Sequence, residues 1–275
     1  MKEIAVLLTV HNRKEKTLKC LEDLYSNRIP DGFRIEVFLT DDGCKDGTPE
    51  AIKKVFPQIH ILQGDGNLYW NRGMLLAWEY ALNHSDCEAV IWLNDDTYLF
   101  PNAIEVIVEK TKRYPDSIIV GTISSRNGII TYGGYKNGNI LLHPNQEEIE
   151  CDYFNGNVVY VPRSVSDKIG LLDRKFIHRM GDFEYGRRAK RCGVSSYVLP
   201  AIGVCERNSS YTKWTDTAYS PWMRLKLLYS PLGYNPFQAF HLERGDSMVR
   251  ACLVFVYLHM KALFPTIFRD KHVAS

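Results

Sequence analysis

The 275-residue sequence lacks the features that mark several common classes of protein. Its seven cysteines form no Cys-x-x-Cys pair and are odd in number, so neither a zinc site nor a disulfide framework is predicted. A net charge of +2, with basic residues scattered among acids, gives no field that would attract nucleic acid. No internal repeat, low-complexity linker or Gly-Lys-Ser/Thr phosphate loop occurs. We therefore expect no nucleic-acid partner and a location in the reducing cytoplasm.

Long apolar runs are missing as well. The longest, Ala251 to Leu258, is far shorter than the ~20 residues that a membrane-spanning helix needs. The N-terminal apolar stretch from Ile4 to Val10 leads into His11 without a small-residue cleavage site, so we expect a first strand and no signal peptide. A hydrophobic content of 45% is enough for one sizeable globular domain with a small appendage.

Strand-like and helix-like segments alternate through the first third of the chain. Short continuous apolar runs predict buried strands, and apolar residues at helical spacing predict helices. The expected strands are 4–10, 35–39, 60–62 and 89–93, and the expected helices are 15–25, 48–56 and 69–82. This alternation predicts an α/β fold with a mostly parallel sheet flanked by helices.

The pattern changes in the remainder of the chain. Between residues 118 and 161 short β-like runs are separated by glycine and asparagine, which predicts hairpins. The next expected elements are helices at 165–172 and 183–192 and a strand at 196–199. An aromatic-rich tail then predicts two or three helices. We therefore expect a catalytic domain of residues 1–210 and a helical C-terminal extension of residues 211–275.

Polar and acidic residues follow three of the predicted strands. They are Thr9, His11 and Asn12 after the first strand, Asp41-Asp42 after the second, and Asn94-Asp95-Asp96 after the strand that ends at Leu93. In open parallel sheets this edge carries the ligand site. Neighbouring carboxylates repel one another and lose water as a site forms, so a cation should compensate them. Mg²⁺ or Mn²⁺ on Asp95 and Asp96 would do so, and a solvated helix-capping turn is the alternative.

Other candidate segments have two interpretations each. Asp41 could accept hydrogen bonds from a nucleobase or ribose, or its loop could only cap the helix that starts at Thr48. The glycine-bearing loop 64–73 opens a helix and could present N–H groups to phosphate, although it is a weak signal. Asp182 could take a proton from a hydroxyl as general base, or simply cap its helix.

The motifs become specific because they occur together in one order. They are the segments 7–13, 40–48, 66–73, 92–96, 154–157 and 181–189. Over about residues 4 to 206 the chain resembles the family 2 inverting glycosyltransferases, which have the Rossmann-like GT-A fold. The sequence Gly-Asn-Leu-Tyr-Trp at residues 66–70 looks most like the corresponding segment of the rhamnosyl-type transferases that build bacterial surface polysaccharides, such as capsule and O-antigen.

The resemblance implies a donor site and a catalytic base. It implies that Asp182 is the base, with Glu184 and Arg188 supporting its helix, and that Asp96 with Asp95 binds Mn²⁺ or Mg²⁺. The expected contacts to the nucleotide sugar are Thr9, His11, Asn12, Asp41, Asp42, Gly66, Asn67, Arg72, Asn94, Asp95, Asn155 and Gly156. The expected reaction is inverting transfer from a UDP- or dTDP-sugar to a saccharide acceptor, lipid-linked in many surface-polysaccharide pathways.

The sequence departs from the family pattern at three places. Asn94 replaces an aspartate of the metal triplet, Gly181 replaces a glutamate, and Cys205-Glu206 stands where many members have a histidine. Glu206 is the candidate substitute for that ligand. Two alternatives stay open, namely a degenerate sugar-nucleotide-binding subunit without activity and a sugar-1-phosphate nucleotidyltransferase.

The C-terminal extension bears on the acceptor. Residues 248–268 are rich in apolar and aromatic side chains, interrupted by Arg250, His259 and Lys261. An amphipathic helix on the inner face of the cytoplasmic membrane is one interpretation. Packing against the catalytic domain or a homodimer contact is the other.

Overall fold

The computed structural model describes residues 1–136, 138–206 and 213–268. The described chain forms two compact units, one of residues 1–174 and 181–206 and one of residues 175–180 and 213–268. The boundary expected between residues 210 and 211 lies outside the described residues.

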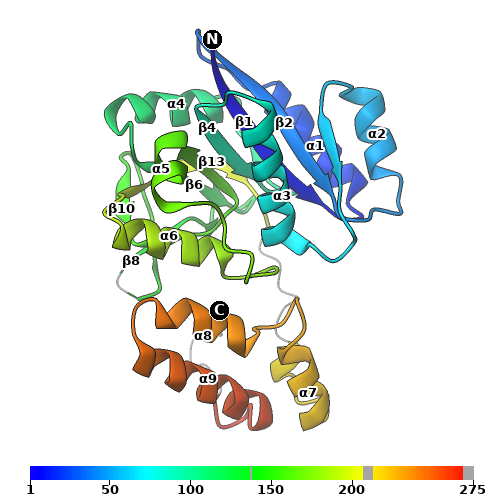
Figure 1. Ribbon diagram of the computed structural model, residues 1–275, viewed down its shortest axis with the longest axis vertical. Helices are drawn as coiled ribbons and strands as arrows, with labels where there is room; N and C mark the ends of the chain where they lie inside the picture. Colours follow the sequence, from blue (N-terminus) through cyan, green and yellow to red (C-terminus); the bar gives the residue numbers. More distant parts are fainter. Residues whose placement is uncertain (137, 207–212, 269–275) are drawn as a thin grey trace. The chain divides into compact units, whose positions relative to one another are not determined.

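The first unit is built on a sheet with the predicted mostly parallel core (Figure 1). Its main path runs in the order β10-β13-β6-β12-β4-β1-β2-β3. The strands are β1 (Lys2–Val10), β2 (Phe33–Asp41), β3 (His60–Gln63), β4 (Ala89–Leu93), β6 (Ile118–Ser124), β10 (Ile149–Cys151), β12 (Val158–Pro162) and β13 (Ser196–Val204). Strand β1 pairs in parallel with both β2 and β4, whereas β12 is antiparallel to its neighbours β4 and β6. The loops that follow β1, β2 and β4 therefore meet at one edge.

Helices cover both faces of the sheet because its central strands are apolar on both sides (Figure 1). On one face lie α1 (Lys14–Tyr25), α2 (Thr48–Val55) and α4 (Ala103–Arg113), and on the other lie α3 (Tyr69–His84), α5 (Arg163–Ile169) and α6 (Gly181–Arg191). Along β1, Ile4 and Val6 pack with the first set, while Ala5 and Leu7 pack with the second. This alternation fixes which side of the sheet each strand-end residue faces.

The region 118–161 contains the predicted hairpins together with three strands of the main sheet, β6, β10 and β12. Strand β7 (Ile130–Tyr132) folds back on β6, and β8 (Gly134–Lys136) pairs with β9 (Ile140–Leu141) and with β11 (Tyr153–Phe154). Helix α4 and the two-residue strand β5 (Tyr98–Leu99) were not expected. Ile104, Ile107 and Val108 supply the helical spacing that would have predicted α4.

The second unit contains three α-helices in its described part, within the predicted number. They are α7 (Pro221–Leu228), α8 (Pro236–Arg244) and α9 (Met248–Leu263), after a short 3-10 turn at Lys213–Thr215. Each α-helix begins with a side-chain cap, from Ser220, Asn235 and Ser247 respectively. Within the described residues, no helix is both long and apolar enough to cross a membrane.

Candidate active site

The loops after strands β1 and β2 are bound to each other. The side-chain oxygen of Asn12 accepts a hydrogen bond from the backbone N–H of Lys45 at 2.7 Å. Nδ1 of His11 lies 2.6 Å from the carbonyl oxygen of Asp42. The structure thus brings the predicted contacts His11 and Asn12 to the Asp41-Asp42 turn.

Asp41 and Asp42 are both buried, but their carboxylates have different tasks. Asp41 accepts one hydrogen bond, from the backbone N–H of Cys44 at 2.8 Å. Asp42 accepts three, from the backbone N–H groups of Gly66, Leu68 and Tyr69 at 2.9, 3.1 and 2.8 Å. Hydrogen bonds to a charged acceptor are the strong ones, so Asp42 holds the loop that enters helix α3. Its role as a direct donor contact stays a prediction.

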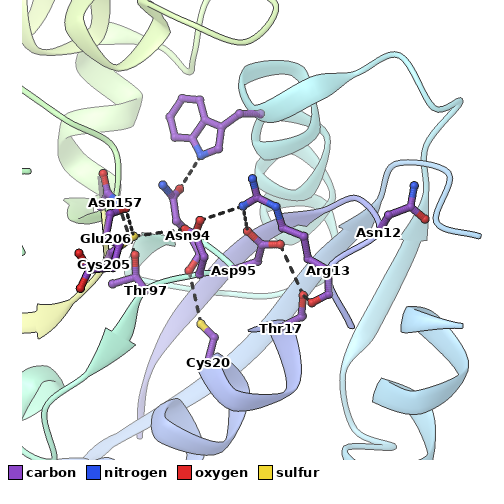
Figure 2. A network of polar contacts seen from close by, with 12 residues as sticks. Asn12, Arg13, Thr17, Cys20, Asn94, Asp95, Thr97, Asn157, Cys205 and Glu206 are labelled. Carbon is purple, nitrogen blue, oxygen red and sulfur yellow. Dashed lines mark hydrogen bonds and ion pairs between the residues drawn. The ribbon is translucent and has the colours of Figure 1, made fainter. Parts of the chain in front are cut away.

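Asp95 and Asp96 converge on one cation, Arg13. The two aspartates form the turn after β4 and are only 5% and 9% exposed. Nη1 of Arg13 donates to Oδ1 of Asp95 at 3.1 Å and to Oδ2 of Asp96 at 2.9 Å. Figure 2 shows the guanidinium of Arg13 turned toward Asp95, with the hydroxyl of Thr17 on the other side of that carboxylate. A positive charge does compensate the acidic turn, and it comes from the protein itself, through Arg13.

The surroundings of this turn disfavour negative charge. Burial raises the pKa of the Asp95 carboxyl to about 7, against the attraction of Arg13. The thiol of Cys205 lies 3.6 Å from Oδ1 of Asp96, and that of Cys20 lies 3.4 Å from a backbone oxygen of the same turn. Burial raises the pKa of both thiols, that of Cys205 to about 12. Both sulfurs are therefore protonated and donate weakly to oxygen.

The side chain of Asn94 is bound to helix α3. Its oxygen accepts a hydrogen bond from Nε1 of Trp70 at 2.7 Å, and Figure 2 shows Asn94 turned toward that indole ring. The amide gives the indole an acceptor without adding a third negative charge beside Asp95 and Asp96. A direct contact of Asn94 with the donor or metal stays a prediction.

Asp182 is the second residue of helix α6. Its Oδ2 accepts from the backbone N–H of Gly156 at 2.9 Å, and its Oδ1 accepts from the N–H of Phe183 at 2.9 Å. The side-chain oxygen of Asn155 accepts from the hydroxyl of Tyr135 at 3.1 Å. The predicted base is thus joined to the Asn155-Gly156 segment, whose contact with the transferred sugar stays a prediction. Further along α6, Arg188 forms an ion pair with Glu184 at 2.9 Å, which supports the helix as expected.

Side chains from the first turn of α3 cover two glycines that flank the predicted base. A Cβ on Gly156 would lie 2.5 Å from Cζ2 of Trp70, and a Cβ on Gly181 would lie 1.7 Å from Oδ1 of Asn71. Neither position can carry a side chain unless its neighbour moves. The departure from glutamate at position 181 therefore has a steric reason, which is the presence of Asn71.

Three other residues that were predicted to contact the nucleotide sugar are Thr9, Asn67 and Arg72. Thr9 packs against Gly73 of α3, and its hydroxyl has no hydrogen-bond partner among the described residues. Asn67 is exposed, and Arg72 donates from Nε to the carbonyl oxygen of Arg174 at 3.1 Å. Asn67 and Arg72 lie on the loop and helix start of α3, whereas Thr9 lies on β1, and among the described residues none of the three side chains hydrogen-bonds to the acidic turns.

The ligand set for a metal is small. In residues 1–136, 138–206 and 213–268, no group of three or more His, Cys, Asp and Glu side chains is arranged to hold a metal ion. Glu206, the expected substitute for a missing histidine, accepts the backbone N–H of Arg126 at 3.0 Å. The described chain therefore offers Asp95 and Asp96 as a pair of carboxylates.

Sequence reasoning did not select three residues of this site. They are Arg13, Trp70 and Asn71. Arg13 directly follows His11-Asn12 after the first strand, so its positive charge could have predicted a contact with the acidic residues at the same edge of the sheet. Trp70 and Asn71 lie in the motif 66–73, but their contacts could not be predicted, because the residues they contact come from distant parts of the chain.

Comparison with known families bears on the choice between a glycosyltransferase and a nucleotidyltransferase. The model of the glycosyl transferase family 2 matches residues 5–165, more than half of the chain. The chain belongs to this family. It is therefore a glycosyltransferase, and family membership favours this activity over the nucleotidyltransferase alternative.

Curated relatives of this family 2 transferase include two mycobacterial enzymes. It is 22% identical over 209 residues to the N-acetylglucosaminyl-diphospho-decaprenol L-rhamnosyltransferase of Mycobacterium tuberculosis, which covers 65% of this chain and 68% of the relative. It is 22% identical over 251 residues to the galactofuranosyltransferase GlfT2 of Mycolicibacterium smegmatis, covering 78% of this chain and 37% of the relative. The resemblance to rhamnosyl-type transferases is thereby confirmed.

Solved structures confirm the GT-A fold. S. aureus TarS aligns with 99% of this chain at a TM-score of 0.59 and 14% identity, and this chain spans 46% of the TarS chain. A TarS fragment of residues 1–349 in complex with UDP aligns with 99% of this chain, also at a TM-score of 0.59, with 13% identity and 76% of that fragment covered.

Proposed function

We propose that this transferase moves a sugar from a UDP- or dTDP-sugar to a lipid-linked saccharide acceptor during synthesis of a bacterial cell-surface polysaccharide, with inversion at the anomeric carbon. Two similar proteins support this, because one is named for transfer to a diphospho-decaprenol-linked sugar and the other was solved in complex with UDP. A cytoplasmic location, where nucleotide sugars are made, belongs to the same proposal.

One observation carries the proposal. The indole of Trp70 hydrogen-bonds to Asn94 of the acidic turn and packs on Gly156, whose N–H binds Asp182. The turn at Asp95-Asp96 is suited to a donor diphosphate, and the carboxylate of Asp182 is suited to an acceptor hydroxyl. The side chain of Trp70 therefore links the two. A site with these two functions side by side fits group transfer between a diphosphate donor and a hydroxyl acceptor.

Asp95 and Asp96 fit a divalent metal that is shared with the donor. Two buried carboxylates already converge on one positive charge. Mg²⁺ and Mn²⁺ commonly take one or two protein carboxylates and complete their shell with phosphate oxygens and water. Asp96 and Asp95 would hold the ion, which supplies electrostatic stabilisation of the departing diphosphate.

Asp182 would act on the acceptor. Its carboxylate takes the proton of an acceptor hydroxyl, whose oxygen forms the new bond to the anomeric carbon as the bond from that carbon to the diphosphate oxygen breaks. The N–H groups of Gly156 and Phe183 fix the orientation of the carboxylate before the acceptor arrives. Attack opposite the leaving group produces the inverted anomer.

A panel of nucleotide sugars tests this function. UDP-, dTDP- and GDP-sugars are screened with Mn²⁺ for thermal stabilisation and for slow hydrolysis, and the anomeric configuration is read by NMR on the glycoside formed with a saccharide acceptor, because a free sugar mutarotates. We expect one UDP- or dTDP-sugar to stabilise the protein, to be hydrolysed slowly and to be transferred to the acceptor with inversion. Binding without any hydrolysis or transfer would favour the non-catalytic subunit instead, and retention would overturn the single displacement.

The C-terminal helices supply a candidate contact with the membrane that holds a lipid-linked acceptor. The exposed apolar residues of α9 include Val249, Leu253, Val256, Tyr257 and Met260, at helical spacing along one stripe. Trp222 on α7 and Phe237 on α8 are also exposed. Exposed cations in this unit include Lys213, Lys226 and Arg244. Apolar stripes with basic neighbours bind anionic bilayer surfaces.

Flotation with phosphatidylglycerol vesicles tests this contact. We expect the wild type to float, Leu253→Glu to lose most of its binding, and the control Val55→Glu, an equally exposed valine position on α2, to float like the wild type. Light scattering, which measures the oligomeric state, tests the alternative that the stripe forms a homodimer contact. A dimer that Leu253→Glu dissociates, without flotation of the wild type, would assign the stripe to a second copy.

A further inference from the structure

The loop that leads into α3 is a rigid support. The carboxylate of Asp42 binds three of its backbone N–H groups, and Tyr69 adopts a left-handed conformation with φ of 55°. A non-glycine residue keeps this conformation only where its surroundings hold it. The backbone before Trp70 and Asn71 is therefore fixed, and it determines where these two side chains lie in the site.

Trp70 contacts both halves of the site. Its Nε1 donates to Asn94 at 2.7 Å, and its six-membered ring lies so close to Gly156 that a Cβ there would approach Cζ2 to 2.5 Å. Its ring also meets Trp92 edge to face, with centroids 6.1 Å apart. A shift of this one side chain would move the acidic turn and the segment that donates to Asp182.

Asn71 acts on the base from its other side. It is fully buried, and its Nδ2 donates to the carbonyl oxygen of Asp173 at 2.9 Å. Its side chain occupies the space in which a Cβ of Gly181 would stand, directly before Asp182. The position at which α6 begins is thus set by the contact between Asn71 and Gly181.

We propose that Trp70 and Asn71 are positioning residues that tie the donor-binding turn to the catalytic base, Trp70 through Asn94 and Gly156 and Asn71 through Gly181. This inference rests on the proposed function. It also gives two departures from the family pattern, Asn94 and Gly181, a common cause, since each contacts one of these adjacent residues. The donor turn and the base are then aligned by one helix start.

The donor side is tested by the affinity for UDP with Mn²⁺, or for dTDP if that nucleotide binds better, measured by calorimetry. Trp70→Phe keeps a ring but loses the N–H, so we expect about fivefold weaker binding, the worth of one hydrogen bond. Asn94→Ala should weaken binding equally, and the double variant should be no weaker than either single one. Trp92→Phe is the matched control, because Nε1 of Trp92 has no partner among the described residues, and its affinity should stay within about twofold.

The base side is tested by turnover of the donor in the hydrolysis assay. Gly181→Ala should lower kcat at least about tenfold while UDP affinity stays within about threefold, since the clash displaces Asp182 and spares the donor turn. Asn71→Ala added to Gly181→Ala should recover part of the lost kcat by making room for the new Cβ. Thermal unfolding checks that each variant is folded.

The outcomes separate this inference from the function on which it rests. Equal losses in Trp70→Phe and Trp92→Phe, or a Gly181→Ala variant that loses UDP affinity as much as kcat, would show general packing and overturn the positioning roles. Absence of nucleotide binding or turnover in the wild type itself would instead overturn the proposed function.

Discussion

Two pairs of adjacent aspartates end parallel strands at the same edge of the sheet, yet they are neutralised in different ways. Asp41-Asp42 after β2 and Asp95-Asp96 after β4 are buried to a similar extent. The first pair is bound by backbone N–H groups, which the chain fixes permanently. The second pair is bound by the side chain of Arg13, which can move. In the proposed function, the second pair is therefore the one that exchanges its partner for a metal, because that partner is a side chain and not the backbone of a loop.

The largest effect should come from the exchangeable pair. Asp96→Asn removes a carboxylate from the expected metal site, so we expect donor turnover to fall at least about a hundredfold, because the charge on the departing diphosphate is no longer stabilised. Steady-state kinetics with the donor found in the panel measures this. Turnover within a few fold of the wild type would assign the metal, if any, to other residues.

The fixed pair should matter for stability first. Asp42→Asn replaces a buried carboxylate that accepts three N–H bonds, and we expect a loss of about 3 kcal/mol in the free energy of unfolding. Asp65→Asn is the control, since Asp65 accepts one N–H on the exposed part of the same loop, and it should cost less than about 1 kcal/mol. Urea unfolding compares them, and equal losses would contradict the difference in roles.

Exchange at the second pair should be visible as metal affinity. Arg13→Gln removes the cation that competes for Asp95 and Asp96, so we expect free Mn²⁺ to bind about tenfold more tightly at pH 8.5 without nucleotide. Electron paramagnetic resonance measures free Mn²⁺. Lys16→Gln, which removes a more distant charge near Asp95, should change the affinity far less. Unchanged or weaker binding in Arg13→Gln would show that Arg13 and the metal do not compete.

The smallest effect comes from a carboxylate that is paired far from either turn. Glu148 accepts from Lys110, Arg113 and Tyr114, and the hydrogen bond from Lys110 is the main reason that its pKa falls from the ordinary 4.5 to about 2. Because the pKa of Glu148 is lower in the folded protein, its charged form stabilises the fold at pH values above the ordinary pKa of 4.5. This stabilisation is lost as the pH falls through about 2.

Glu148→Gln should therefore cost about 1–2 kcal/mol at pH 7, and the cost should shrink as the pH falls below 4.5. Urea unfolding of both proteins at several pH values measures it. A cost independent of pH would mean that the pairing of Glu148 does not act through its charge.

Much of this site follows from the sequence because strand ends are easy to predict. Continuous apolar runs located β1, β2 and β4, and the rule that parallel strands carry ligands at their carboxyl ends brought the polar residues after them to one edge. The prediction that Asp182 is the base came from the resemblance, since an aspartate at a helix start is otherwise an ordinary cap.

The role of each carboxylate could not be predicted from the sequence, because it depends on which hydrogen-bond donors the fold brings into contact with it. Asp42 and Asp95 look alike in the sequence, but Asp42 accepts from backbone N–H groups of residues 66–69, whereas Asp95 accepts from the side chains of Arg13 and Thr17. Gly181 could not be explained either, since Asn71 meets it only through tertiary packing.

The most direct test of the whole account is Asp182→Asn, measured for both UDP–Mn²⁺ affinity and sugar transfer. The account predicts affinity close to that of the wild type and no detectable transfer, because the donor turn is intact and the proton acceptor is gone. A fully active Asp182→Asn variant would contradict the role of Asp182 as the base and with it the proposed arrangement of the site.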